Sequence, residues 1–306
     1  MEQPTILERL AKGDVLVSDG ATGTYLQANG LEPGGCPEAF NVDQPEIIRR
    51  MAADYFNAGS DMVLTASFGG SRFMLDKYGY SGHAHEFNRL AAMHAKSVAS
   101  QWHFVVGSVG PTGEILDSNG GTTAEDEIYD AFVDQLTGLE EGGADAAVIE
   151  TMISVEEALL AVRAAKEHTS LVVMSTLMYD KGPRGWFTMM GDTPASATKR
   201  LQDAGADVVG TNCGNGSDRM VELAKIIRET YDGYMLVHSN AGIPEIRQGQ
   251  IVYPETPEYM TERFLKLMEV GVIIVGGCCG TTPKHIERFA EAVHDRDPVG
   301  YPVTVS

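Results

Sequence analysis

Three of the four cysteines in this chain have a spacing that suggests one shared centre. The stretch VGGCCGTT at 275–282 sets Cys278 beside Cys279 behind a pair of glycines, and Cys213 lies upstream in VGTNCGNG. Three thiolates and one vacant position form a catalytic zinc arrangement, since structural zinc takes four protein ligands. Two other interpretations stay open, small cysteines buried in the core and a redox pair, although the chain has no C-x-x-C motif and a vicinal disulfide is strained.

A zinc ion held by three thiolates would favour one kind of chemistry. The thiolates more than cancel the metal charge, which makes the ion a poor Lewis acid toward water. A fourth, substrate thiol can still bind and lose its proton while its sulfur stays nucleophilic. Alkyl transfer to sulfur is therefore favoured over hydrolysis, and Cys213, Cys278 and Cys279 are both candidate metal ligands and candidate catalytic residues.

Eight short apolar runs supply the elements that must position these thiols. They are VLVSDGA at 15–21, DMVLTASF at 61–68, FVVGSVG at 104–110, AAVIET at 146–151, LVVMSTL at 171–177, VVGTNC at 208–213, MLVHSN at 235–240 and VIIVGGCC at 272–279. Segments of helical periodicity lie between most of them, for example at 45–59, 127–143 and 155–168. This alternation predicts a closed (β/α)8 TIM barrel, with a doubly wound open sheet as second choice. Because no linker or low-complexity tract interrupts the pattern, we expect a single domain over 1–306.

In such barrels the chemistry sits at the C-terminal ends of the strands, whose loops form one rim. The predicted strand ends carry Asp19, Gly20, Thr65, Ser67, Ser108, Glu150, Thr151, Asn212, Cys213, Asn240, Cys278 and Cys279. The sixth and eighth strands are separated by one strand, so their ends lie roughly 10 Å apart at the backbone. Gly276, Gly277 and Gly280 permit a distorted strand end that turns both adjacent sulfurs toward one point.

The amino-acid composition and net charge exclude several classes of protein and partner. A hydrophobic content of 43%, a charged content of 22% and 34 glycines describe a soluble globular chain with many turns. The net charge of −20 argues against nucleic acid or an anionic membrane as a partner. The N-terminal segment 1–14 reads as a short amphipathic helix without a signal-peptide core, and no run of eighteen apolar residues occurs. We therefore expect a cytoplasmic protein, where clustered cysteines bind metal or catalyse reactions more often than they form disulfides.

Several motifs in this order resemble those of the homocysteine S-methyltransferase family. They are DGATGT at 19–24, TASFGG at 65–70, GSVGPTG at 107–113, IET at 149–151, GTNCG at 210–214 and GGCCGTTPKHI at 276–286. The resemblance covers nearly the whole chain, and the cysteine pair with its upstream partner is highly specific. NAGIPEIRQGQIVY at 240–253 and MMGDTP at 189–194 look most like the bacterial betaine-dependent members, while the homocysteine module of cobalamin-dependent methionine synthase is also similar.

The resemblance implies a zinc-dependent barrel that transfers a methyl group to homocysteine and so forms methionine. By position, Asp19 and Glu150 would hold the amino acid substrate, and the backbone around Gly20 and Ala21 would take its carboxylate. A glycine-rich turn can present N–H groups to a carboxylate, in agreement with this assignment. A homo-oligomer is expected. Asp19 has an alternative role as a turn or capping residue.

The methyl donor is less closely defined. The chain carries no D-x-H-x-x-G signature for the lower ligand of cobalamin, so we expect a diffusible donor or a methylated corrinoid on a separate protein. A betaine-like quaternary ammonium or sulfonium donor, such as S-methylmethionine, would require aromatic faces. Tyr25, Phe68 and Trp186 are the candidates, the last in a loop after the fifth strand whose glycines suit a mobile lid. Each aromatic residue alone is more often a packing residue.

The sequence leaves two rival functions open. A metal-dependent hydrolase would need a His-x-His pair at an early strand end, but His83 and His85 fall in a helical run, and His238 on the seventh strand reads as a satisfied core residue. A binding module would hold homocysteine or a metal, or dock a corrinoid protein, without catalysing transfer alone. Cys36, in the loop after the first strand, has no role beyond that loop in this interpretation.

Overall fold

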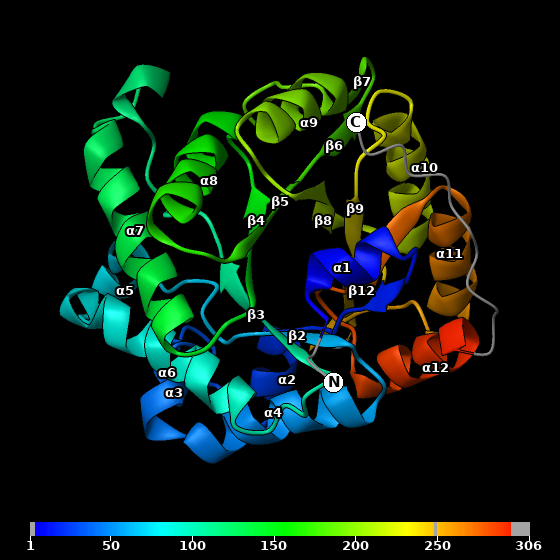
Figure 1. The fold of residues 1–306 in the computed structure, drawn as a ribbon, viewed down its shortest axis with the longest axis horizontal. Helices are drawn as coiled ribbons and strands as arrows, with labels where there is room; N and C mark the ends of the chain where they lie inside the picture. Colours follow the sequence, from blue (N-terminus) through cyan, green and yellow to red (C-terminus); the bar gives the residue numbers. More distant parts are fainter. Residues whose placement is uncertain (1–3, 248–249, 295–306) are drawn as a thin grey trace.

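The computed structural model describes residues 4–247 and 250–294, which form a barrel of parallel strands enclosed by helices (Figure 1). The barrel strands are β1 (Leu16–Val17), β2 (Met62–Leu64), β3 (Phe104–Val109), β4 (Ala146–Met152), β5 (Val172–Leu177), β8 (Val208–Gly216), β9 (Met235–Asn240) and β12 (Val272–Gly277). They are hydrogen-bonded in the order β1-β12-β9-β8-β5-β4-β3-β2. This order confirms the predicted (β/α)8 barrel, because a doubly wound sheet would reverse its strand order at a switch point.

The first and second barrel strands, β1 and β2, are not paired with each other in a hydrogen-bonded ladder. Two aspartate side chains and one backbone hydrogen bond link them instead. The Asp61 N–H donates to Val17 O at 2.8 Å, and the Val17 N–H donates to Asp61 Oδ2 at 2.8 Å. Closer to the C-terminal rim, the Leu64 N–H donates to Asp19 Oδ2 at 2.8 Å. The carboxylates of Asp61 and Asp19 therefore replace part of the missing backbone pairing.

Helices form the outer layer and cover one end of the barrel. They are α1 (Ile6–Ala11), α2 (Thr22–Ala28), α3 (Phe40–Asp43), α4 (Pro45–Asn57), α5 (Arg72–Asp76), η1 (Ser81–His83), α6 (Ala84–Lys96), η2 (Asp117–Asn119), α7 (Glu125–Glu141), α8 (Val155–His168), α9 (Pro194–Asp203), α10 (Ser217–Arg228), α11 (Pro257–Glu269) and α12 (Pro283–His294). Local signals set their ends: Pro45 opens α4, and Ser154 Oγ accepts the Glu157 N–H at the start of α8. Within the described ranges, no helix is long and apolar enough to cross a membrane.

The interior of the barrel is filled by alternate residues of the strands. Its apolar layer includes Leu16, Met62, Phe104, Val106, Ala146, Val148, Met174, Val208, Leu236 and Ile274, and Ile6 and Leu10 of α1 belong to the same cluster. Because strand side chains alternate between faces, the residues two or four positions further on also point inward. Those residues are polar at the C-terminal rim, namely Ser108, Glu150, Thr176, Asn212 and His238. The strand pattern thus places a polar layer directly above an apolar floor.

Several predicted boundaries were wrong. The strand expected at 272–279 ends at Gly277, so the two adjacent cysteines lie in the turn beyond it. A hairpin of β6 (Asp180–Gly182) and β7 (Gly185–Phe187) forms the segment after the fifth strand, for which a mobile lid stays a prediction. A second hairpin, β10 (Glu245–Arg247) with β11 (Gln250–Val252), follows β9. Part of the helix expected at 1–14 lies outside the described residues.

Candidate active site

The structure brings the three predicted cysteines together at the C-terminal rim. Cys213 lies in the last part of β8, and Cys278 and Cys279 directly follow β12. The three Sγ atoms all lie within 4.8 Å of one another, and those of Cys213 and Cys279 are 4.0 Å apart. Two sulfurs bound to one tetrahedral zinc at ~2.3 Å each would lie about 3.8 Å apart. The geometry and the soft donor set therefore fit a zinc ion, and no other group of three such residues occurs within 4–247 and 250–294.

The turn that carries the cysteine pair is fixed by backbone hydrogen bonds. The Cys278 N–H donates to Ser239 O at 2.7 Å, and the Ala241 N–H donates to Cys279 O at 2.9 Å. Thr281 Oγ1 donates to Cys278 O at 2.7 Å, which closes the turn. The thiols are thereby held in place by β9 and by their own loop.

Cys213 reaches the pair through an uncommon backbone conformation. Its φ is 60°, in the left-handed region that non-glycine residues seldom adopt, and Thr151 at the end of β4 has a φ of 59°. Asn212 links these two positions, because its Oδ1 accepts the Thr151 N–H at 2.7 Å and its Nδ2 donates to Thr151 Oγ1 at 2.8 Å. Among the described residues, these are the two non-glycine positions with positive φ, and both line one cavity. Backbone strain of this kind concentrates at functional sites.

The three thiols share protons unequally. Hydrogen bonds from Cys213 and Cys278 lower the pKa of Cys279 to about 3, and the Tyr253 hydroxyl contributes to the same effect. The pKa of Cys278 is raised well above its usual range, because its thiol hydrogen-bonds to Cys213 and Cys279 and is buried. The three thiols therefore compete for protons in the metal-free site. A bound dication would remove this competition, since thiols lose their protons when they coordinate a metal.

A cavity of about 370 Å³ opens beside the thiols. Its lining combines residues 20–24 at the start of α2, Pro37, Glu38, the segment 64–68, Ser108, Glu150, Thr151, Cys213, His238, Gly277, Cys278 and Cys279. None of these residues is lysine or arginine. The cavity therefore offers thiols, carboxylates and backbone groups to a ligand, but no basic side chain.

Glu150 is a buried carboxylate in the cavity lining. Ser108 Oγ donates to its Oε1 at 2.5 Å, and Asn212 Nδ2 donates to its Oε2 at 2.9 Å. Burial raises the pKa of Glu150 to about 7, with a smaller contribution from the charge of Cys213. Each carboxylate oxygen retains a further acceptor position, so a cationic group in the cavity would find an incompletely satisfied partner.

Asp19, unlike Glu150, does not line the cavity. Asp19 is buried at the end of β1 and is not part of the cavity lining, although Gly20 and Ala21 are. Burial raises the pKa of Asp19 well above its usual range, and the charge of Glu150 adds to the shift. The Ala21 N–H already donates to Thr281 Oγ1 at 3.1 Å. Asp19 therefore helps to close the barrel. The Ala21 N–H, which was predicted to bind the substrate carboxylate, already has a partner within the protein.

The structure separates the three aromatic candidates for a donor pocket. Phe68 lines the cavity and is 39% exposed. Trp186 is 4% exposed within the hydrophobic core, and its Nε1 donates to Glu222 Oε1 at 3.4 Å. The Tyr25 hydroxyl donates to Asp54 Oδ2 at 2.5 Å. Neither Tyr25 nor Trp186 belongs to the cavity lining. Their polar atoms bond instead to Asp54 of α4 and Glu222 of α10.

Two cavity residues were missed or misread from the sequence. His238 was expected to be a satisfied core residue, but its buried Nε2 has no hydrogen-bond partner among the described residues. Its inward position two residues after Leu236 is the signal that identifies it. Glu38 comes from the loop before α3 and is 4% exposed; its Oε1 accepts the Gly69 N–H at 2.6 Å. The strand pattern could not identify Glu38, because this residue lies in an irregular loop that folds back to the rim.

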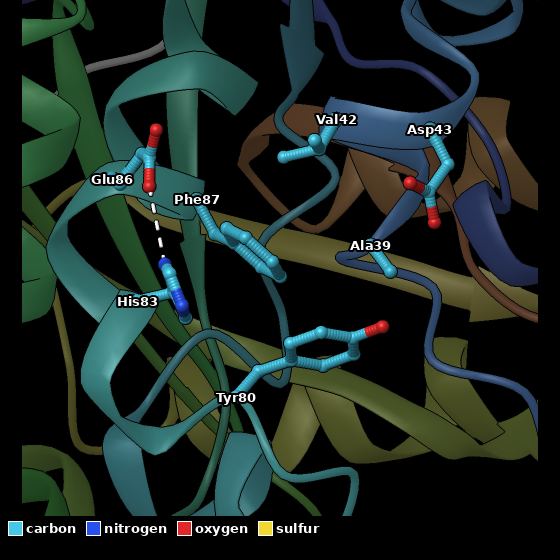
Figure 2. Close-up of a pocket in the computed structure, with 7 residues that line it drawn as sticks. All are labelled: Ala39, Val42, Asp43, Tyr80, His83, Glu86 and Phe87. Carbon is cyan, nitrogen blue, oxygen red and sulfur yellow. Dashed lines mark hydrogen bonds and ion pairs between the residues drawn. The ribbon is translucent and has the colours of Figure 1, made fainter.

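A second hollow, of about 170 Å³, lies between α3 and the start of α6 (Figure 2). Figure 2 shows Tyr80 and Phe87 on one side of it, and His83 Nδ1 within 3.2 Å of Glu86 Oε2. Since His83 ends η1 and His85 lies in α6, neither histidine is at a strand end. The His-x-His pair therefore cannot join the thiols at the rim.

Comparisons with known proteins agree with this fold and site. A family model described as homocysteine S-methyltransferase matches residues 16–293. The methionine synthase of Mycobacterium leprae is 31% identical over 94% of the chain, and that of Mycobacterium tuberculosis is 31% identical over 91%. The chain spans only 25% and 24% of the lengths of these two relatives.

A solved structure has a similar fold. The metallated form of the homocysteine methyltransferase MmuM from Escherichia coli superposes with a TM-score of 0.76 at 19% identity, covering 92% of this chain and 98% of that one. At this level of identity, the likeness concerns the fold alone. Together with the family match over residues 16–293, these findings show that the chain belongs to the homocysteine S-methyltransferase family.

Proposed function

We propose that this protein transfers a methyl group from a small onium donor, such as betaine, to the thiol of homocysteine, giving methionine. The observation that carries the proposal is the convergence of three sulfurs within 4.8 Å beside a cavity without basic side chains. The family relationship supports the same acceptor, since the matching family model is named for transfer to homocysteine.

Cys213, Cys278 and Cys279 would hold a zinc ion in this reaction. The ion would supply the positive charge that allows a fourth, substrate thiol to bind as a thiolate at neutral pH. The protein must then orient the substrate and exclude water from the reacting atoms. Glu150 would bind the substrate ammonium group, with Asp19 behind it, and residues 20–24 at the start of α2 would face the substrate carboxylate.

The transfer step is a direct displacement. The substrate sulfur attacks the methyl carbon in line with the leaving group, so that an S–C bond forms as the bond from carbon to the onium nitrogen or sulfur breaks. The electron pair of the broken bond leaves with the neutral amine or sulfide, and the proton of the acceptor thiol is lost to solvent on binding. Positioning and thiolate formation provide the acceleration, and no base acts on the methyl group.

The cavity supports a cationic donor over an anionic one. Glu38 and Glu150 contribute carboxylates to its wall, and Phe68 presents an exposed ring there. Since no lysine or arginine lines the cavity, a quaternary ammonium or sulfonium group meets attraction from carboxylates and from an aromatic face, without a competing cation.

A panel of methyl donors tests this function. Zinc-loaded protein is incubated with homocysteine and betaine, S-methylmethionine, a simple sulfonium salt or a methylated corrinoid protein, and methionine is measured with and without a zinc chelator. Chelator-sensitive methionine from an onium donor is expected. Turnover only with the corrinoid protein would replace the proposed donor, and no turnover with any donor would favour a binding module.

A further inference from the structure

Thr24 contacts the turn that carries Cys278 and Cys279, although the mechanism above assigns its hydroxyl group no role. It lies in the first turn of α2, and 256 positions of the chain separate it from Gly280. The Gly280 N–H donates to Thr24 Oγ1 at 3.0 Å. Thr24 also lines the cavity beside the thiols. One hydroxyl group therefore joins the cavity wall to the residue that directly follows the cysteine pair.

The peptide group between Cys279 and Gly280 is held at both of its polar ends. Its carbonyl oxygen, Cys279 O, accepts the Ala241 N–H at 2.9 Å, and its N–H donates to Thr24 Oγ1. Ala241 directly follows β9, whereas Thr24 belongs to α2, so two separate elements orient this one group. Because a peptide unit is planar, bonds at both ends fix the direction in which the chain leaves the Cys279 Cα atom.

Gly280 has a backbone conformation that depends on restraint from its surroundings. Its φ is 82°, in the left-handed region that glycine adopts without strain. A Cβ atom at this position would overlap the ring of Tyr253, so that ring lies directly against the glycine. Glycine loses more conformational freedom on folding than any other residue. The Tyr253 ring and the Thr24 hydroxyl group supply the restraint that a side chain of its own would otherwise give.

The start of α2 meets the cysteine turn a second time, through Thr281. The Ala21 N–H donates to Thr281 Oγ1 at 3.1 Å, and Thr281 Oγ1 donates to Cys278 O at 2.7 Å. The two contacts act on different peptide groups, since Thr281 bonds to the carbonyl of Cys278 and Thr24 to the N–H after Cys279. Loss of the Thr24 hydroxyl group therefore leaves the Cys278 side in place and removes one of two bonds on the Cys279 side.

We propose that Thr24 is a positioning residue for the metal-binding thiol of Cys279, through the hydrogen bond that its oxygen accepts from the Gly280 N–H. Groups that orient metal ligands without touching the metal change metal affinity by about 10- to 100-fold when they are removed. The inference rests on the proposed function, because it takes Cys213, Cys278 and Cys279 as the ligands of a zinc ion.

Metal binding by variants of Thr24 tests the assignment. Thr24→Val keeps the shape of the side chain but cannot accept the Gly280 N–H, Thr24→Ala adds no methyl group in place of the oxygen, and Thr24→Ser keeps the oxygen. Thr169→Val is the matched control, because Thr169 is also partly buried and its Oγ1 also accepts a backbone N–H, that of Leu171 at 3.4 Å. Thr169 lies at the end of α8, outside the cavity lining.

Two measurements report on the metal and one on the fold. Competition with a chromogenic chelator gives the dissociation constant for zinc. The thiolate-to-cobalt charge-transfer band of the cobalt-loaded protein reports how many sulfurs bind the metal. The melting temperature of each metal-free variant shows whether the change has a general effect on stability.

We expect zinc affinity to fall by about tenfold or more in Thr24→Val and Thr24→Ala, and to stay within about threefold of wild type in Thr24→Ser and Thr169→Val. The cobalt band should weaken in the first two variants alone, while all four metal-free proteins melt at similar temperatures. Unchanged zinc affinity in Thr24→Val, or an equal loss in Thr24→Ser or Thr169→Val, would overturn the assignment and leave the proposed function intact. Failure of the wild-type thiols to bind zinc would overturn both.

Discussion

The Sγ atoms of Cys213 and Cys279 lie 4.0 Å apart, although 66 positions separate the two residues in the chain. Their proximity follows from the barrel, which places the ends of β8 and β12 on one rim with β9 between them. Cys278 completes the group within 4.8 Å. The site is therefore assembled by the closure of the barrel and not by a local motif alone.

Loss of one cysteine from this group should abolish tight metal binding. Cys213→Ser leaves two thiolates, and we expect the affinity for zinc to fall by on the order of 100-fold or more, because ligand number determines the stability of such sites. Cys36→Ser is the matched control, since Cys36 lies outside the group. Competition with a chromogenic chelator measures both constants, and equal affinities in the two variants would show that Cys213 is not a ligand.

The buried acid Glu150 should make stability depend on pH in the metal-free protein. Its pKa is about 7 in the folded state, whereas a glutamate in an unfolded chain titrates near about 4.3. Between these values the folded state retains a proton that the unfolded state has released, so the free energy of unfolding falls as pH rises from about 4 to about 7.

Replacement of this carboxyl group by an amide tests that dependence. Relative to its effect at pH 4, Glu150→Gln should raise the free energy of unfolding at pH 8 by about 3 kcal/mol, because the amide cannot ionise. Urea unfolding of wild type and variant at the two pH values gives the comparison. The same effect at both pH values would contradict a raised pKa.

The exposed ring of Phe68 should contribute to donor binding. Phe68→Leu removes an aromatic face from the cavity wall, and the KM for a cationic donor is expected to rise roughly three- to thirtyfold, which corresponds to about 0.5–2 kcal/mol. The KM for homocysteine should change little. Trp186→Phe is the control from outside the cavity, and a rise in donor KM in that variant alone would reverse the two assignments.

The close approach at Gly20 should make this position intolerant of a side chain. A Cβ atom there would lie 2.7 Å from Thr281 Oγ1 and 2.9 Å from the Tyr55 hydroxyl oxygen. Since Thr281 closes the cysteine turn, Gly20→Ala is expected to lower zinc affinity and to destabilise the protein by about 1–3 kcal/mol. Gly82→Ala, which meets no atom within 4 Å, serves as control. Unchanged zinc affinity in Gly20→Ala would disprove the coupling.

Much of this architecture could be predicted because strands and barrel rims leave periodic signals. The eight apolar runs identified the barrel strands, and the position of Cys213 and Glu150 at strand ends placed them on one rim. Glu38 could not be found this way, since it reaches the cavity through an irregular loop. Trp186 was misplaced for a related reason, because nothing in the sequence showed that its ring packs into the hydrophobic core.

His238 shows a different limit. Alternation from Leu236 indicates that the ring points inward, yet the sequence gives no count of hydrogen-bond partners. Only the three-dimensional arrangement shows that Nε2 is buried without a hydrogen-bond partner among the described residues. Satisfied and unsatisfied buried histidines look alike in a sequence.

X-ray absorption spectroscopy at the zinc edge, with and without homocysteine, tests the central claim most directly. The account predicts one zinc per chain with three sulfur neighbours at about 2.3 Å, and a fourth sulfur neighbour at a similar distance once homocysteine is added. A zinc environment with fewer than three sulfurs, or a sulfur count that does not rise with homocysteine, would contradict it.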